Sequence, residues 1–151
     1  MIRRCVSLPS GRTVVRACLL LSVFVLGGCS SPASPTFGTV SAAGLEGVWT
    51  LEIIQRAGGP ALATPRNAVY TLTFRSGTVL AQADCNTCVG TFTMVGDAVT
   101  ISPALACTRA ACPTSDFEVI YEALLPGESR VGVSEQTMVL NSSRGQLRFT
   151  R

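Results

Sequence analysis

Four cysteines lie in two sequence pairs that could do chemistry, Cys85 with Cys88 and Cys107 with Cys112. Paired thiols form disulfides, bind zinc or exchange electrons with another disulfide. The Cys-x-x-Cys spacing of the first pair suits zinc, but the four residues between Cys107 and Cys112 are a looser spacing. A thioredoxin-type motif starts a helix, whereas the first pair lies between two expected strands. Structural disulfides are therefore favoured, with zinc binding and redox exchange as alternatives.

Four cysteines allow three pairings. Residues equally distant from an expected hairpin turn at 96–97 lie opposite each other, which favours the nested disulfides Cys85–Cys112 and Cys88–Cys107 over the crossed pairing. Two disulfides between sequence neighbours are least favoured, because a bond across two intervening residues in an extended strand end is strained. Closing the longer nested loop would stabilise the fold by roughly 3 kcal/mol.

The sequence contains no histidine. A Ser-His-Asp triad, a Cys-His dyad and any histidine metal ligand are therefore excluded. The sequence predicts no catalytic residue, no metal site and no cofactor, so the protein is not expected to be an enzyme.

Two polar residues are candidates for an interaction site. Asn86 is expected at a bend between strands, in a turn or left-handed conformation, or lining a binding mouth. Arg109 is expected to brace a loop at the surface or to meet a partner. Glu118 is interpreted as a helix-capping residue, and Trp49 as a core residue.

Alternating apolar residues predict the strands that position these residues. Trp49, Leu51 and Ile53 share one face of the first strand. A two-residue turn at Ser76-Gly77 then sets apolar residues opposite each other: Phe74 with Val79, Leu72 with Ala81, and Tyr70 with Ala83. The same inward face, continued by two residues, reaches Cys85.

Five further strands follow the same rule. Around the turn at 96–97, Phe92 is expected opposite Ile101 and Met94 opposite Val99, and by parity Cys88 and Cys107 face inward. The last three strands carry apolar residues on one face: Val131 and Val133 opposite Met138 and Leu140, then Leu147 and Phe149.

A short helix of about ten residues is expected after Thr114. Ser115 and Glu118 have the spacing of a capping box, and Phe117, Ile120 and Leu124 form one apolar stripe. The predicted fold is mainly β: a small antiparallel, incomplete or cracked barrel of about eight strands, with the helix inserted between strands five and six.

Residues 1–28 resemble a bacterial lipoprotein signal peptide. Arg3, Arg4, Arg12 and Arg16 form a basic start, and residues 17–26 are a short apolar core. The tetrad Leu-Gly-Gly-Cys that ends at Cys29 resembles a lipobox, which predicts cleavage after Gly28 and lipidation of Cys29. Ser30 follows, where an aspartate tends to retain Gram-negative lipoproteins at the inner membrane. The expected location is therefore the outer membrane, facing the periplasm.

Residues 29–44 are rich in Ser, Pro and Ala and are expected to form a flexible tether, and residues 45–151 are enough for one domain. All twelve basic residues are arginines, and four of them lie in the predicted signal peptide, which leaves eight against nine acidic residues. The full chain's net charge of +3 therefore becomes about −1 after cleavage. Nucleic acid is not an expected partner.

The domain resembles the META domain family of the heat-inducible outer-membrane lipoprotein type. The resemblance is carried by several short motifs in the right order: Leu45-x-Gly47-x-Trp49-x-Leu51, Leu72-x-Phe74, Cys85-Asn86-x-x-x-Gly90-x-Phe92, Leu105-Ala106-x-Thr108-Arg109-x-x-Cys112, Glu118, Leu124, Leu140 and Phe149. It implies a small β-rich domain, often lipid-anchored in the envelope and associated with stress tolerance, with no defined biochemical activity. Family members often carry cysteines at 85 and 112, whereas Cys88 and Cys107 replace an expected large apolar residue and a methionine.

Two classes of function are compatible with this sequence. The first is a non-enzymatic envelope lipoprotein that serves as a stress-related structural or protein-interaction module, with the membrane and an envelope protein as partners. The alternative is a small binding barrel that holds an apolar ligand or inhibits a periplasmic protease. A filled core would argue against the ligand.

Overall fold

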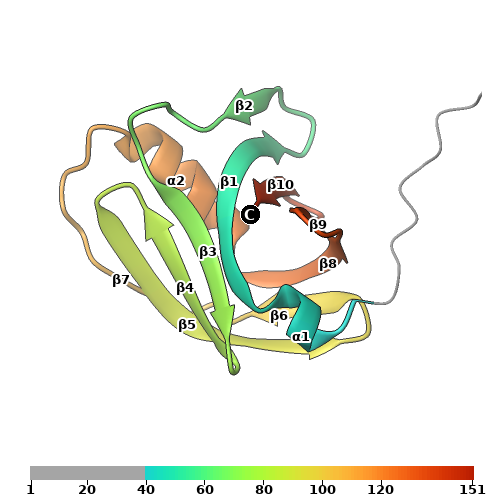
Figure 1. The fold of residues 1–151 in the computed structure, drawn as a ribbon. Coiled ribbons are helices and arrows are strands. Elements are labelled where there is room, and N and C mark those ends of the chain that lie inside the picture. The colour runs from blue at the N-terminus through green and yellow to red at the C-terminus, as the bar shows by residue number, and fades with distance from the viewer. Residues whose placement is uncertain (1–39) are drawn as a thin grey trace, which may run out of the picture. The chain divides into compact units, whose positions relative to one another are not determined.

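The computed structural model describes residues 40–151 as a closed β-barrel with one main helix (Figure 1). The predicted signal peptide, Cys29 and the tether up to residue 39 lie outside the described residues. The last residues of the predicted tether are folded: Ser41 caps the short helix α1 (Ala42–Leu45) by accepting a hydrogen bond from the Gly44 amide. Val40 and Leu45 are buried in the core, so apolar contacts start the domain earlier than composition suggested.

Ten antiparallel strands and the helix α2 (Ser115–Leu124) make up the rest of the domain. The strands are β1 (Gly47–Arg56), β2 (Ala61–Ala63), β3 (Tyr70–Arg75), β4 (Thr78–Ala83), β5 (Asn86–Val95), β6 (Ala98–Ile101), β7 (Ala106–Cys107), β8 (Gly127–Val133), β9 (Thr137–Ser142) and β10 (Gly145–Thr150). All except β2 and β7 form the barrel. The predicted eight strands, with the helix between the fifth and the sixth, are confirmed.

The barrel closes completely, whereas an incomplete barrel was expected. The long strand β1 provides the closure, because residues 47–50 pair with β3 and residues 50–56 pair with β10. The register shifts between Leu51 and Ile53, and such a bulge bends a strand from one neighbour toward the next. β2 and β7 are short additions that pair with β1 and β5.

The registers predicted for the hairpins are confirmed. Tyr70, Leu72 and Phe74 lie opposite Ala83, Ala81 and Val79, and the pairs of β5 with β6 and of β8 with β9 also match. Ser76 and Gly77 both have positive φ angles, of 47° and 77°. This is the conformation that a tight two-residue hairpin turn requires.

The helix α2 is present at the predicted length, but the predicted capping box is wrong. The N-cap residue is Thr114, not Ser115, and its side chain caps no helix amide. On the side of the helix that faces the barrel, Tyr121 and Leu124 are buried, and Phe117 and Ile120 are partly buried. The Tyr121 hydroxyl donates a hydrogen bond to the Thr71 carbonyl (2.8 Å), which fixes the helix to β3.

Large side chains fill the interior of the barrel. Trp49, Tyr70, Phe74, Tyr121 and Phe149 are each at most 1% exposed, and the rings of Phe74 and Phe92 pack edge to face. The Trp49 indole donates a hydrogen bond to the Leu45 carbonyl, which satisfies its one polar atom inside the core. Trp49 is therefore a core residue, as predicted.

Candidate functional site

The β4–β5 turn starts the region where the predicted site residues meet. Asp84 has a φ angle of 56°, so the left-handed residue is Asp84 and not Asn86, which already belongs to β5. The turn also changes which side chains face inward: Cys85 is exposed and Asn86 is buried. The prediction that the inward face of β4 continues to Cys85 is therefore wrong, because the turn ends the alternation.

Two disulfides connect this turn and β5 to the segment before α2. Cys85 is bonded to Cys112, and Cys88 is bonded to Cys107, which is the nested pairing favoured by the sequence. Cys88 and Cys107 are directly opposite in the β5–β7 register, with Cα atoms 4.0 Å apart. Cys88 faces inward and is buried, while Cys107 is half-buried.

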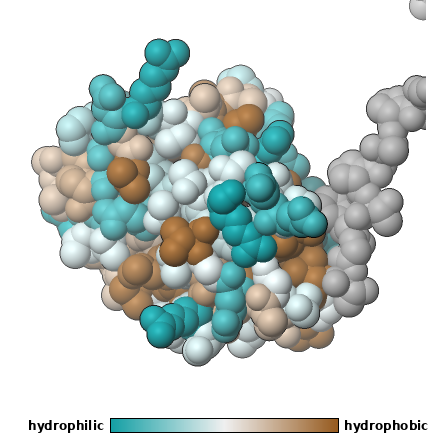
Figure 2. Space-filling model, in the orientation of Figure 1, coloured by the Kyte–Doolittle hydropathy of each residue, from teal (hydrophilic) through white to brown (hydrophobic). Residues whose placement is uncertain are grey.

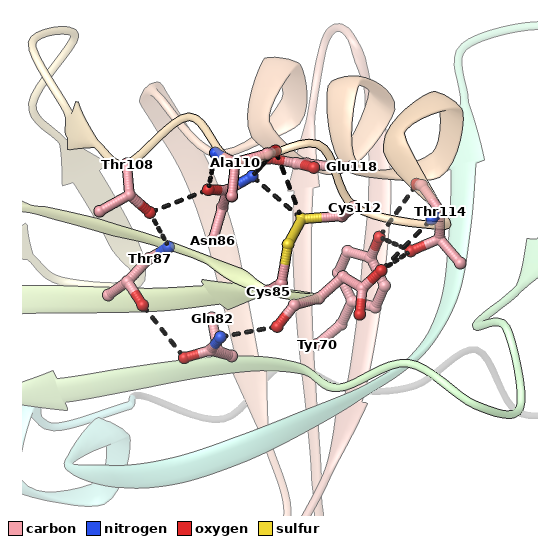
Figure 3. The surroundings of a disulfide bond; sticks show 11 residues. Tyr70, Gln82, Cys85, Asn86, Thr87, Thr108, Ala110, Cys112, Thr114 and Glu118 are labelled. Atoms are coloured by element: carbon pink, nitrogen blue, oxygen red, sulfur yellow. Dashed lines mark hydrogen bonds between the residues drawn. A yellow bond between two sulfur atoms is a disulfide. The ribbon is translucent and has the colours of Figure 1, made fainter.

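Asn86 lies between the two connected segments and uses both ends of its amide (Figure 3). Its oxygen accepts hydrogen bonds from the Ala110 amide (2.8 Å) and the Thr108 hydroxyl (2.9 Å). Its nitrogen donates to the Ala110 carbonyl (2.9 Å) and the Glu118 carboxylate (2.8 Å), and lies 3.1 Å from the Cys112 sulfur. Because Asn86 is only 1% exposed, it braces the loop from inside and does not line a binding mouth.

Glu118 is a buried carboxylate, 5% exposed, that points from α2 to Asn86 (Figure 3). It does not cap the helix, so the capping role assigned from the sequence is wrong. A signal for its burial is present in the sequence: Glu118 precedes Tyr121 and Leu125 by three and seven residues, which places the three side chains on one helix face. The capping-box spacing of Ser115 and Glu118 led to the capping interpretation, although this helix-face pattern was also present in the sequence.

A second polar connection ties the turn to the start of α2. The Asp84 carboxylate accepts hydrogen bonds from the Thr114 hydroxyl (2.6 Å) and the Thr114 amide (3.3 Å). Since Thr114 gives its only hydroxyl proton to Asp84, the Tyr70 hydroxyl 2.7 Å away donates to Thr114. Burial raises the pKa of Tyr70 above its usual 10.0, which keeps this donor protonated.

Arg109 braces the loop from the outside. Its guanidinium lies 2.6 Å from the Glu122 carboxylate of α2, although the arginine side chain is 65% exposed. The hydrogen bond to Glu122 raises the pKa of Arg109 above its usual value. The structure therefore brings both predicted interaction residues to one loop, Asn86 beneath it and Arg109 on it.

The outer face of the barrel carries a mostly apolar row, in which Thr73 is the one polar residue. Val48, Thr73, Leu80, Val89 and Ala106 lie opposite one another on five neighbouring strands, β1, β3, β4, β5 and β7. Directly opposed residues of antiparallel strands point to the same side, and Val48, Leu80 and Val89 are 55%, 40% and 44% exposed. A hollow of about 460 Å³ lies along this row, lined by Leu80 and Val89 together with polar residues such as Arg75. We call these five residues the outer row.

Apolar residues also reach the surface elsewhere. On the face in Figure 2, they form separate patches between hydrophilic residues. Val69, Val95 and Val119 are examples of exposed apolar side chains outside the outer row. Single exposed apolar residues are ordinary on protein surfaces, whereas an aligned row across five strands is a more specific feature.

The polar groups around Asn86 and the two disulfides are arranged to hold a loop. Among the described residues, every buried side-chain nitrogen and oxygen atom has a hydrogen-bond partner. A group whose hydrogen bonds are all used inside the protein is suited to fixing structure. Neither helix within residues 40–151 has the length and apolarity needed to cross a membrane.

Comparisons with known proteins find the same domain elsewhere. The NMR structure of a protein from Burkholderia xenovorans is similar, with a TM-score of 0.62 and 25% sequence identity over 80% of this chain and 98% of that one. A second NMR structure has a TM-score of 0.57 at 18% identity, covers 74% of this chain and 94% of its own, and supports the fold alone. No curated protein matches the sequence.

The sequence pattern of the META domain matches residues 43–151, close to the predicted domain of 45–151. The match covers the barrel, both disulfides and α2. The chain therefore belongs to the META domain family.

Proposed function

We propose that the protein is an exported lipoprotein of the bacterial cell envelope, a non-enzymatic module that acts through contacts with other proteins. The META family assignment and the small barrel support a non-catalytic, envelope-type module. The observation that carries the proposal is the combination of a lipobox-like sequence ending at Cys29 with two disulfides in the domain that follows. Disulfides persist in exported proteins and are rare in the cytosol of most bacteria.

The lipid anchor would place the domain at the periplasmic face of the outer membrane. Acyl chains on Cys29 would provide the membrane attachment, since each buried methylene contributes about 0.8 kcal/mol. A role in stress tolerance is the finer proposal that the family resemblance suggests. In that role, the disulfide-bonded barrel would provide a stable surface to which an envelope protein binds.

The outer row offers a surface for such contacts. It combines exposed Val48, Leu80 and Val89 with the hollow of about 460 Å³, and aligned apolar residues of this kind are typical of interaction sites. The barrel interior, in contrast, is filled by aromatic and aliphatic side chains. This packing speaks against the alternative of an apolar ligand held inside, and no observation favours protease inhibition.

The proposal is tested by acyl labelling of the full chain in a Gram-negative host. We expect wild-type protein to incorporate labelled palmitate and to sediment with outer membranes, and Cys29→Ser to lose both properties. Cys18→Ser is the matched control, because Cys18 lies within the expected apolar core of the signal peptide and should not affect labelling. Unlabelled wild-type protein, or labelled Cys29→Ser, would rule out the lipoprotein assignment.

A further inference from the structure

A carboxylate lies beside one of the two disulfides. Cys88, Cys107 and Glu122 each offer one ligand atom, and these three atoms all lie within 4.8 Å of one another. The Glu122 oxygen is 3.3 Å from the Cys88 sulfur. A disulfide sulfur carries no proton to donate, so this is a contact between two electron-rich atoms and stabilises neither of them.

We propose that reduction of the Cys88–Cys107 disulfide creates a binding site for a thiophilic divalent cation such as Zn²⁺, with Glu122 as the third ligand. The reductant would be a dithiol, which supplies two electrons and two protons and itself becomes a disulfide. The bond between the two sulfurs breaks and each sulfur receives a proton. Metal binding then releases these two protons, because thiolate is the form that binds metal.

The geometry fits the ligand set. Ligand atoms held tetrahedrally at about 2.3 Å from zinc lie about 3.7 Å apart. The Glu122 oxygen is already 3.3 Å from the Cys88 sulfur, and the two sulfurs, which are bonded to each other in the structure, would separate to this distance once the disulfide is reduced. Cys88 and Cys107 are held on paired strands with Cα atoms 4.0 Å apart, and Glu122 is held on α2. The half-buried Cys107 leaves one side of the site open for water as a fourth ligand.

The charges of the site also balance. Two thiolates and one carboxylate carry three negative charges, and a divalent cation leaves one. Arg109 supplies the remaining positive charge, because its guanidinium lies 2.6 Å from the other Glu122 oxygen. It would act as an outer partner that orients the carboxylate ligand, a role typical of residues around protein metal sites.

The second disulfide is not part of this cluster. The cluster contains neither Cys85 nor Cys112, and their bond separately joins the β4–β5 turn to the segment before α2. The two cysteine pairs therefore have different roles in the proposal. Cys88 and Cys107 bind the cation, and Cys85 with Cys112 holds the loop.

The test uses cadmium, whose bonds to thiolates give an ultraviolet charge-transfer band. The test protein is the full chain with Cys5→Ser, Cys18→Ser and Cys29→Ser, so that cysteines outside the described domain cannot bind the ion. A phosphine reductant opens the disulfides without adding a competing thiol. We expect the reduced chain to bind one cadmium ion with this band, and the oxidised chain to show none at the same concentration.

Variants separate the proposed site from other sulfur ligands. Cys88→Ser with Cys107→Ser should abolish the band, whereas Cys85→Ser with Cys112→Ser should keep it. Glu122→Gln should weaken binding by at least about tenfold. Asp116→Asn is the matched control, because it removes an exposed carboxylate of the same helix outside the cluster and should change nothing.

The comparison with Glu122→Gln also distinguishes binding at the proposed site from binding to the thiols of an unfolded chain. If reduction unfolded the chain, flexible thiols would bind cadmium equally well in both proteins, and circular dichroism would show the loss of strands. Equal affinity of wild type and Glu122→Gln would therefore overturn the proposal, as would a band that depends on Cys85 and Cys112.

Discussion

Asn86 is the residue on which the disulfide-linked loop depends. Its amide oxygen accepts a hydrogen bond from the Ala110 amide, and its amide nitrogen donates to the Ala110 carbonyl. The same nitrogen also donates to the buried carboxylate of Glu118. A carboxylate that is 5% exposed needs such a donor, because burying an unpaired polar group costs several kcal/mol. Asn86 therefore acts as a structural residue, and its contact with α2 links the loop to the helix.

We predict that Asn86→Ala lowers the free energy of unfolding by about 3 kcal/mol, since hydrogen bonds contribute about 1 kcal/mol each and the buried Glu118 loses its donor. Urea denaturation measures this change. Asn141→Ala is the control: Asn141 is exposed on β9, and exposed substitutions usually change stability by less than about 0.5 kcal/mol. Equal effects of the two substitutions would contradict the assigned role of Asn86.

Among the elements, the pairing of β1 with β10 closes the barrel, and we call this strand pair the seam. Gly145 starts β10 opposite Arg56, with a φ angle of 150°. A Cβ atom at this position would collide with the Gln55 carbonyl oxygen and would lie 2.9 Å from the Arg56 Cα. Both atoms belong to the backbone of β1, so neither can move without disturbing the seam.

Gly145→Ala is therefore predicted to destabilise the domain by about 2–4 kcal/mol, as overpacking against a fixed backbone adds to conformational strain. Gly58→Ala is the matched control. Gly58 also has a positive φ angle, of 71°, but a Cβ there would meet nothing within 4 Å. Gly58→Ala should therefore lower the free energy of unfolding by only about 1–2 kcal/mol. Thermal denaturation of both variants compares them, and a smaller loss for Gly145→Ala would show that the seam tolerates movement.

The elements also show what the sequence could predict. Hairpin registers depend on local alternation and on a turn such as Ser76-Gly77, so they were predicted residue by residue. Closure depends on β1 pairing with two strands far apart in the sequence, which alternation does not encode. The burial of Asn86 was missed for a related reason: the turn at Asp84 and Cys85 shifts the inward face, and the partners of Asn86 come from residues 108–118.

At the scale of the whole molecule, α2 and the barrel enclose a common core, with Tyr121 between them. Tyr121 is fully buried, packs edge to face on Tyr70 and bonds the Thr71 carbonyl. Burial, followed by the interaction with Tyr70, raises the pKa of Tyr121 well above the usual 10.0. The phenol therefore ionises at lower pH in the unfolded chain than in the folded one.

This difference makes the stability of the whole domain depend on alkaline pH. The contribution of Tyr121 is complete below the unfolded pKa of about 10 and decreases as pH rises, because the unfolded chain then releases a proton that the folded chain keeps. The decrease is at most about 1.4 kcal/mol per pH unit. Tyr121→Phe should be less stable by about 1 kcal/mol near neutral pH through the lost hydrogen bond, yet should lose stability less steeply above about pH 10. Urea midpoints across this range measure both slopes, and parallel curves would mean that Tyr121 ionises without opening the core.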